Sequence, residues 1–160
     1  MLPKLNRVLF NILVKDMAVS MDFYRRIVDL QPIYESDWFV VLTPAGQPNV
    51  QIGLIDQVSE FAPRHAWGDH EGAYMTFVVD DVFRALEAAR EMGVEVIEEP
   101  VALEYGQTRL LVRDPNGMIL DLSTPTAELA EREDVDVVAS PKSTAIDQHQ
   151  PEERDSRTMH

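Results

Sequence analysis

The chain contains the same module twice, and this internal repeat limits the folds it can adopt more than any other feature of the sequence. The first copy reads VLFNILVKDMAVSMDFYRRIVDLQPIYE (residues 8–35) and the second reads AYMTFVVDDVFRALEAAREMGVEVIEEP (residues 73–100). Each copy starts with an alternating strand, continues with an aspartate at a helix N-cap, and then has apolar residues at helical spacing. Further strands follow each copy, so the sequence predicts the order βαβββ twice.

The alternation divides each predicted strand between two faces. One face is expected to pack under the helices, and its first-strand residues are Phe10, Ile12, Val14, Met75, Phe77 and Val79. The opposite face carries polar groups on a largely apolar floor, which suits a small organic ligand if the sheet is curved. Its expected members are Leu9, Asn11, Leu13, Gln51, Gly53, Tyr74, Thr76, Val78, Ile119, Asp121 and Ser123.

Composition and charge exclude several classes of protein. The chain has no cysteine, which excludes disulfides, thiolate catalysis and cysteine-ligated metal centres. Its net charge of −14 argues against nucleic acid as a partner and weakly favours cationic ligands. No run is apolar enough to cross a membrane, and MLPKLNRVLF lacks the long apolar region of a signal peptide. We therefore expect a cytoplasmic protein that binds neither nucleic acid nor membrane.

The length of 160 residues suits one domain followed by a tail. We expect the domain to cover residues 1–126, with modules at 6–56 and 73–125 and a linker between them. Residues 127–160 hold nine acidic and four basic side chains and no Phe, Trp or Tyr. This composition predicts an acidic tail that is disordered beyond about residue 140, after a short helical turn at 128–133. An alternative is an acidic tail that binds a partner.

Three segments resemble the glyoxalase / bleomycin resistance / extradiol dioxygenase family, the vicinal oxygen chelate superfamily. They are LVKDMAVSMDFYRRIVDLQPIYE (residues 13–35), TFVVDDVFRALEAAREMGVEVIEEP (76–100) and YGQTRLLVRDPNGMILDLSTP (105–125). The resemblance implies an α+β, glyoxalase-like fold in which two βαβββ modules form a cupped, half-open barrel. It also implies a homodimer, in some members with modules exchanged between subunits.

Enzymes of this family hold one divalent metal ion in the cup through His, Gln or Glu ligands. The resemblance places the four ligand positions on Leu9, on Gln51 or Gly53, on Tyr74 and on Asp121. Leu9 cannot bind a metal, and Tyr74 is neutral at pH 7 and a rare ligand. We therefore expect no metal ion and no cofactor. The alternative is a metal-dependent lyase or dioxygenase with atypical ligands, in which Asp121, Gln51, His70 and Tyr74 converge on one ion.

The resemblance favours a metal-free small-molecule binding protein of the bleomycin-resistance type, with a cationic or aromatic ligand. The expected ligand-binding residues are Trp38, Gln51, Tyr74, Tyr105, Arg109 and Asp121. Trp38 could stack on a flat cation, or it could fill core or dimer contacts. Arg109 could hold a ligand carboxylate, or pair with Glu104 or Asp121. Asp121 could bind a cationic or hydroxyl-bearing ligand, or only accept hydrogen bonds from Tyr74 or Asn11.

Two further interpretations remain open at this stage. An enzyme without metal would use Asp121 as a general base near Tyr74, which requires a desolvated carboxyl with a raised pKa. His65 and His70, with Asp69 or Glu71, could bind a metal, although a solvated loop is the favoured interpretation of this linker. Trp67 in the same linker could cover the cup or anchor a dimer.

Overall fold

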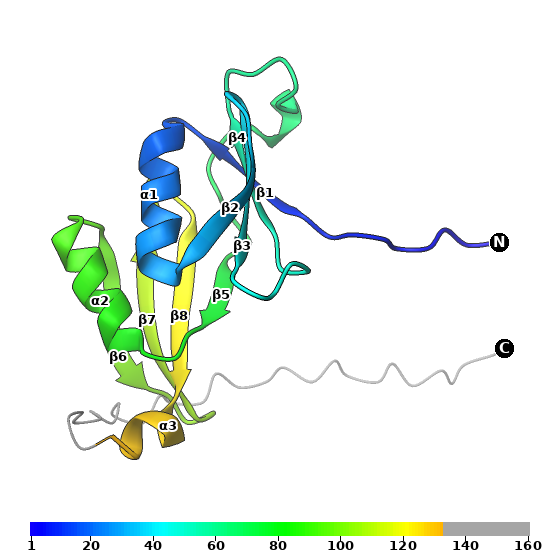
Figure 1. Cartoon of the computed structure of the whole chain (residues 1–160). Helices are drawn as coiled ribbons and strands as arrows, with labels where there is room; N and C mark the ends of the chain where they lie inside the picture. The colour runs from blue at the N-terminus through cyan, green and yellow to red at the C-terminus, as the bar shows by residue number, and fades with distance from the viewer. Residues whose placement is uncertain (133–160) are drawn as a thin grey trace, which may run out of the picture.

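A computed structural model describes residues 1–132, and the part of the expected tail beyond them lies outside the described residues. The first module comprises β1 (Phe10–Val14), α1 (Met17–Val28), β2 (Leu30–Glu35), β3 (Phe39–Pro44) and β4 (Ile52–Asp56). The second comprises β5 (Met75–Val78), α2 (Val82–Glu91), β6 (Val96–Ala102), β7 (Gln107–Arg113) and β8 (Ile119–Pro125). A short 3₁₀ helix η1 (Arg64–Ala66) lies between the modules, and α3 (Thr126–Ala130) follows them (Figure 1). The predicted α+β fold of two βαβββ modules is confirmed.

Both long helices begin and end where the sequence predicts. Asp16 caps α1 by accepting a hydrogen bond from the backbone N–H of Val19, and Asp81 caps α2 through the N–H groups of Phe83 and Arg84. Gly93 follows α2 with a φ of +67°, a left-handed conformation that glycine adopts without strain. None of the described helices is long and apolar enough to cross a membrane.

The strands form two separate four-stranded sheets with the same topology. Their orders are β1-β4-β3-β2 and β5-β8-β7-β6, with the first pair of each sheet parallel and the remaining pairs antiparallel. Because β1 and β5 are edge strands, each has one unpaired edge in the chain. Both helices lie on the same side of the two sheets (Figure 1). We call the sheet faces away from the helices the open faces.

One hydrophobic core joins the two modules on the helix side of the sheets. It contains Ile12, Phe23 and Leu54 from the first module and Leu110 and Leu122 from the second, all fully buried. The expected packing residues differ in burial. Phe10 is 38% exposed because it is the first residue of an edge strand, whereas Met75 and Phe77 are half-buried and pack against the core.

A buried polar contact also ties the modules together. The Tyr24 hydroxyl of α1 donates a hydrogen bond of 2.7 Å to Oδ2 of Asp114 in the turn between β7 and β8. Asp114 Oδ1 accepts two further bonds, from the backbone N–H groups of Asn116 and Met118. Burial, together with the charge and hydrogen bond of Asp114, raises the pKa of Tyr24 well above its ordinary value. The turn residues Asp-Pro-Asn-Gly therefore hold α1 on the second module.

Candidate functional site

Charged and hydroxyl side chains gather on the open face of the second sheet, and we call this cluster the polar half. The strand register places Thr76 of β5 beside Asp121 of β8, and Arg109 of β7 beside Ser123. Glu98 of β6 lies beside Leu111, which pairs with Asp121. Thus four strands contribute to one face, because every second residue of a strand points to the same side.

Asp121 lies at the centre of the polar half and is only 5% exposed. Its carboxylate accepts hydrogen bonds from the hydroxyls of Thr76 (3.2 Å) and Ser123. The expectation that Tyr74 or Asn11 would supply these bonds is wrong, because the neighbouring hydroxyls on β5 and β8 are aligned with the carboxylate by register. Tyr74 precedes β5 and is 63% exposed. Two neutral donors leave room on Asp121 for another donor.

Arg109 pairs with Glu98, at 3.0 Å between Nη2 and Oε1. The ion pair is with Glu98 and not with the expected Glu104, since the register of β6 and β7 brings Glu98 to the same face. Asp121, the other expected partner, is close enough for its charge to raise the pKa of Arg109. Burial lowers the pKa of Arg109, but the hydrogen bond and charge of Glu98 outweigh it and raise the pKa from its ordinary value. Among the described residues, Arg109 Nε and Gln107 Oε1 are buried polar atoms without hydrogen-bond partners. Such atoms are costly, so the polar half is incompletely satisfied in the isolated chain.

Tyr105 lies at the rim of the polar half, in the connection between β6 and β7, and is 65% exposed. It is close enough to Arg109 to contribute to that group's raised pKa. Its neighbour Gly106 has a φ of +88°, which turns the chain back into β7.

Four rings form a continuous row on the first module and the connection that follows it, and we call this row the aromatic half. Phe39 is the central ring, with its centroid 5.7 Å from that of Tyr34 and 5.4 Å from that of Trp38, on which it stacks. Trp38 in turn lies 4.7 Å from Phe61, centroid to centroid. Tyr34 and Phe61 are more than half exposed, and Trp38 is half-buried. An exposed row of rings is suited to stacking on a flat molecule.

The side chains of Asn11 and Phe39 both lie over Gly53 on the first sheet. A Cβ at Gly53 would lie 2.0 Å from Asn11 Oδ1 and 3.1 Å from the Phe39 ring, so only glycine leaves space for both side chains. Gln51 has another role in the chain. Its Oε1 accepts a 2.5 Å hydrogen bond from Arg7 Nε, and its Nε2 donates to the Pro48 carbonyl. It therefore tethers the N-terminal segment and does not join Asp121.

The donor set does not fit a divalent metal ion. Of the implied ligand positions, Leu9 has no donor atom, Gly53 has no side chain, and Gln51 is engaged by Arg7. Asp121 is the one carboxylate among them, whereas imidazole and carboxylate groups are the usual ligands of such ions. Within residues 1–132, no three His, Asp or Glu side chains are grouped to hold a metal.

Sequence reasoning missed Glu98 and Phe61. Glu98 was hidden because β6 contains two register shifts, between Val96 and Glu98 and between Glu98 and Val101, so simple alternation does not assign its face. Phe61 lies in an irregular connection, where no periodicity predicts its contact with Trp38. The alternation of β7, in contrast, could have placed Gln107 with Arg109.

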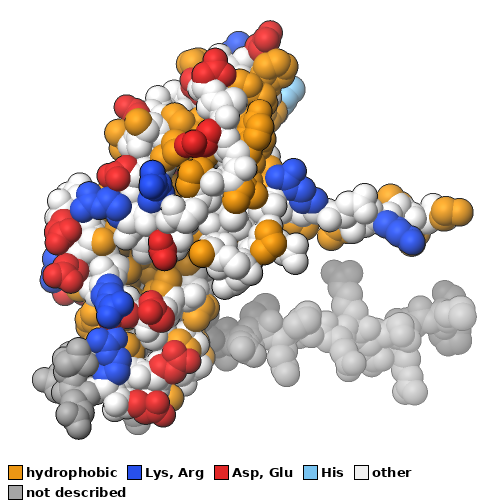
Figure 2. All heavy atoms as spheres, viewed as in Figure 1, with side chains coloured by type: hydrophobic (Ala, Val, Ile, Leu, Met, Phe, Trp, Pro, Cys, Tyr) orange, Lys and Arg blue, Asp and Glu red, His pale blue; other side chains and the backbone are white. Residues whose placement is uncertain are grey.

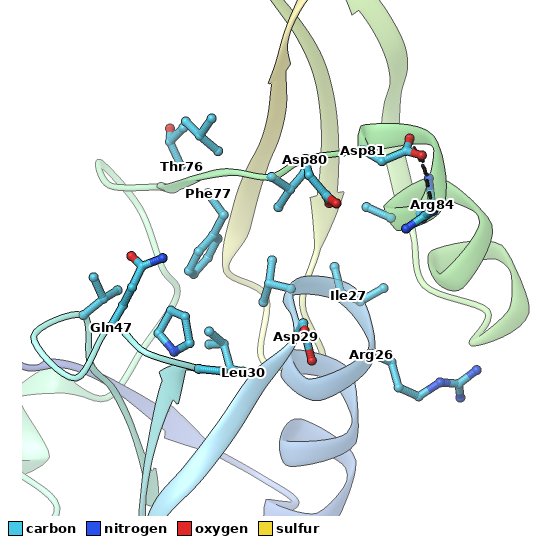
Figure 3. Close-up of a pocket in the computed structure, with 17 residues that line it drawn as sticks. Arg26, Ile27, Asp29, Leu30, Gln47, Thr76, Phe77, Asp80, Asp81 and Arg84 are labelled. Atoms are coloured by element: carbon cyan, nitrogen blue, oxygen red, sulfur yellow. Dashed lines mark hydrogen bonds and ion pairs between the residues drawn. The ribbon is translucent and has the colours of Figure 1, made fainter. Parts of the chain in front are cut away.

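A hollow lies between the modules, and we call it the inter-module cleft (Figure 3). Its volume is about 600 Å³, within the range of small-molecule sites. Ile27, Leu30 and Phe77 supply apolar walls, and Asp29 and Asp80 approach it from opposite modules. None of the six expected ligand-binding residues lines it, but Thr76 borders both the cleft and the polar half.

Comparisons with known proteins agree with this architecture. A protein from the mobile metagenome of V. pseudocholerae is 25% identical, covers 78% of this chain and 98% of its own, and has a TM-score of 0.57. The fosfomycin resistance protein FosX from Listeria monocytogenes is 18% identical (80% and 98% covered, TM-score 0.58). TnmS3, an antibiotic binding protein from Streptomyces sp. CB03234, is 21% identical (78% and 99% covered, TM-score 0.56).

A search of curated proteins finds no match. At 18% and 21% identity, the similarity to FosX and TnmS3 shows a shared fold only. The sequence itself matches a family profile over residues 4–122, which includes both modules nearly in full. The chain therefore belongs to the Glyoxalase/Bleomycin resistance protein/Dioxygenase superfamily.

Proposed function

We propose that this protein binds a small organic molecule between its aromatic half and its polar half, without a metal ion and without changing the ligand. The observation that carries this proposal is the set of hydrogen bonds that the Asp121 carboxylate accepts. It occupies the one implied ligand position with a good metal-binding group, yet its carboxylate is held by the hydroxyls of Thr76 and Ser123 and has no second ligand beside it. The Asp121 carboxylate would therefore accept hydrogen bonds from a ligand.

The chemistry of the two halves defines the ligand class. A row of four rings favours a flat, aromatic molecule, and a tryptophan face favours one that carries positive charge. In the polar half, the carboxylates of Glu98 and of the buried Asp121 both interact with the single guanidinium of Arg109, so the three groups together carry a formal charge of −1. A protonated amine or a hydroxyl of the ligand would complete the hydrogen bonds of Asp121. Antibiotic binding, as described for TnmS3, is a function of this kind on the same fold.

We also propose that the working form is a homodimer. In one chain the two halves lie on separate sheets, and within the described residues the polar half retains buried Arg109 Nε and Gln107 Oε1 without hydrogen-bond partners. Tyr74 and Val78 on the second open face are each more than 60% exposed. Two copies related by a two-fold axis would cover both faces at once and enclose the ligand. Light scattering coupled to size-exclusion chromatography tests this directly.

A ligand screen tests the binding function. Untagged protein is titrated with flat aromatic cations and with neutral hydroxylated analogues of the same ring systems, and binding is followed by calorimetry and tryptophan fluorescence. For a cationic ligand, Asp121→Asn is expected to lower the affinity about 10- to 100-fold, because a charge-assisted hydrogen bond is lost. Glu87→Gln, on the exposed face of α2, is the matched control and should leave affinity unchanged.

Two further measurements separate binding from catalysis. Mass spectrometry of the recovered ligand should show the same molecule that was added. Elemental analysis of the untagged protein should find less than stoichiometric Mn, Fe, Ni, Co or Zn. One metal ion per chain, together with a turnover that a chelator abolishes, would contradict the proposal and support a metal-dependent lyase or dioxygenase with atypical ligands.

A further inference from the structure

The first eight residues form an extended arm that protrudes from the molecule (Figures 1 and 2). Leu2, Leu5 and Val8 are 88%, 80% and 64% exposed, although they are apolar. One side-chain bond, from Arg7 to Gln51, ties the arm to the described chain. A segment that exposes three large apolar side chains and its backbone to water gains nothing from its position unless another surface covers it.

The arm also differs in charge from the rest of the protein. Residues 1–15 contain three basic side chains (Lys4, Arg7 and Lys15) and no acidic one, in a chain of net charge −14. Basic and hydrophobic side chains are visible along the arm in Figure 2. The surface that covers the arm should therefore be both apolar and acidic.

The inter-module cleft has this chemistry. Ile27, Leu30 and Phe77 are apolar surfaces in its walls, and the carboxylates of Asp29 and Asp80 extend from its two sides (Figure 3). Asp29 follows the C-terminus of α1, where the helix dipole adds negative potential. The two arginines that line the cleft already have acidic partners: Arg26 pairs with Asp22 and Glu91, and Arg84 pairs with Asp81.

We propose that the arm of one copy occupies the inter-module cleft of a second copy, with Leu2 and Leu5 against the apolar walls and Lys4 near Asp80. Six extended residues reach about 20 Å, enough to cross to a neighbouring molecule. The arm leaves β1 in a direction away from its own body (Figure 1), and Arg7 is held in that direction by Gln51. The partner is therefore a second chain, and a two-fold axis makes the exchange reciprocal.

This inference rests on the proposed homodimer and adds the contact that holds it. Thr76 and Val78 belong both to the cleft and to the second open face, so an arm in the cleft would lie along the edge of the proposed ligand site. The exchange would therefore join the two copies next to the position where the ligand binds.

Engineered cysteines test the contact, because the natural chain has none. Leu5→Cys is combined with Ala45→Cys, an exposed residue that lines the cleft. Mild oxidation is expected to give a species of twice the 18.2 kDa chain mass on a non-reducing gel. The control combines Leu5→Cys with Glu87→Cys, which lies outside the cleft, and should give little of it. An internally bridged single chain would overturn the exchange.

A charge swap tests the same contact without a bridge. Lys4→Glu is expected to raise the dissociation constant of the dimer at least about tenfold, and adding Asp80→Lys in the same chain should restore it. Deletion of residues 1–8 should weaken the dimer further. A natural chain that is monomeric at all concentrations would refute the homodimer itself. A dimer unaffected by both the deletion and Lys4→Glu would refute the arm contact alone.

Discussion

The hydrogen bond between Tyr24 and Asp114 offers the sharpest test of how the two modules are held together. Tyr24 is fully buried, Asp114 is 4% exposed, and the 2.7 Å bond between them spans the module boundary. Tyr24→Phe removes the hydroxyl but keeps the ring, which packs edge-on against Phe23 at 4.9 Å. The change therefore isolates one hydrogen bond from the packing around it.

Removing this bond should lower the free energy of unfolding by about 2 kcal/mol, since hydrogen bonds to charged groups contribute about 1.5–3 kcal/mol. Asp114 keeps its two backbone donors on Oδ1, but its Oδ2 loses the hydrogen bond from Tyr24 while remaining buried. A chain of this length should then lose about 4–8 °C in Tm. Urea denaturation followed by circular dichroism measures the free energy, and calorimetry measures the Tm.

The raised pKa of Tyr24 adds a dependence on pH with a defined sign. The neutral hydroxyl is favoured in the folded state, so its stabilisation is complete below the ordinary pKa of 10.0 and declines as the pH rises above it. The stability difference between the natural chain and Tyr24→Phe should therefore narrow above about pH 10. Tyr74→Phe, at an exposed ring, is the control and should cost less than about 0.5 kcal/mol. Equal losses in both variants would refute the reasoning.

Three other perturbations have defined outcomes. Gly53→Ala should cost about 1–3 kcal/mol in urea denaturation, because its Cβ would collide with Asn11 Oδ1; Asn11→Gly in the same chain should recover part of this loss. Asp81→Asn should destabilise the fold at pH 7. Burial raises the pKa of Asp81, but Arg132 and backbone N–H groups lower it more, so it lies below its ordinary 3.8. The difference should therefore begin to decline as the pH falls below 3.8 and be lost only below the folded-state pKa. Gly93→Ala should lower the Tm, since its φ of +67° strains other residues.

The helix caps and the buried strand faces could be predicted because they depend on neighbours in the sequence. Asp16 and Asp81 are followed by apolar residues at helical spacing, and both cap helices. Ile12 and Val14 alternate with polar or half-buried residues, and both are fully buried. Phe10 has the same spacing as Ile12 and Val14, yet it is exposed because it lies at the end of an edge strand. Residue spacing does not show which strands lie at the edge of a sheet.

The partners of the polar residues could not be predicted in the same way. Asp121 was expected to meet Tyr74 or Asn11, yet the register of β5 against β8 aligns it with Thr76 and Ser123. Arg109 pairs with Glu98 only because the bulged strand β6 turns Glu98 toward it. A shift of one residue in strand pairing reverses every side chain on the strand, and no local pattern reports such a shift.

The repeat of one βαβββ module follows from local sequence order, because the strand and helix periods of each copy depend only on neighbouring residues. The separation of the two sheets, the division between an aromatic half and a polar half, and the cleft between the modules arise from long-range packing. These features depend on the packing of α1 against α2 and on the bond from Tyr24 to Asp114. Tyr24 and Asp114 are ninety positions apart, and their contact forms only when the whole chain packs into its lowest-energy fold. The local spacing of residues does not predict such a contact.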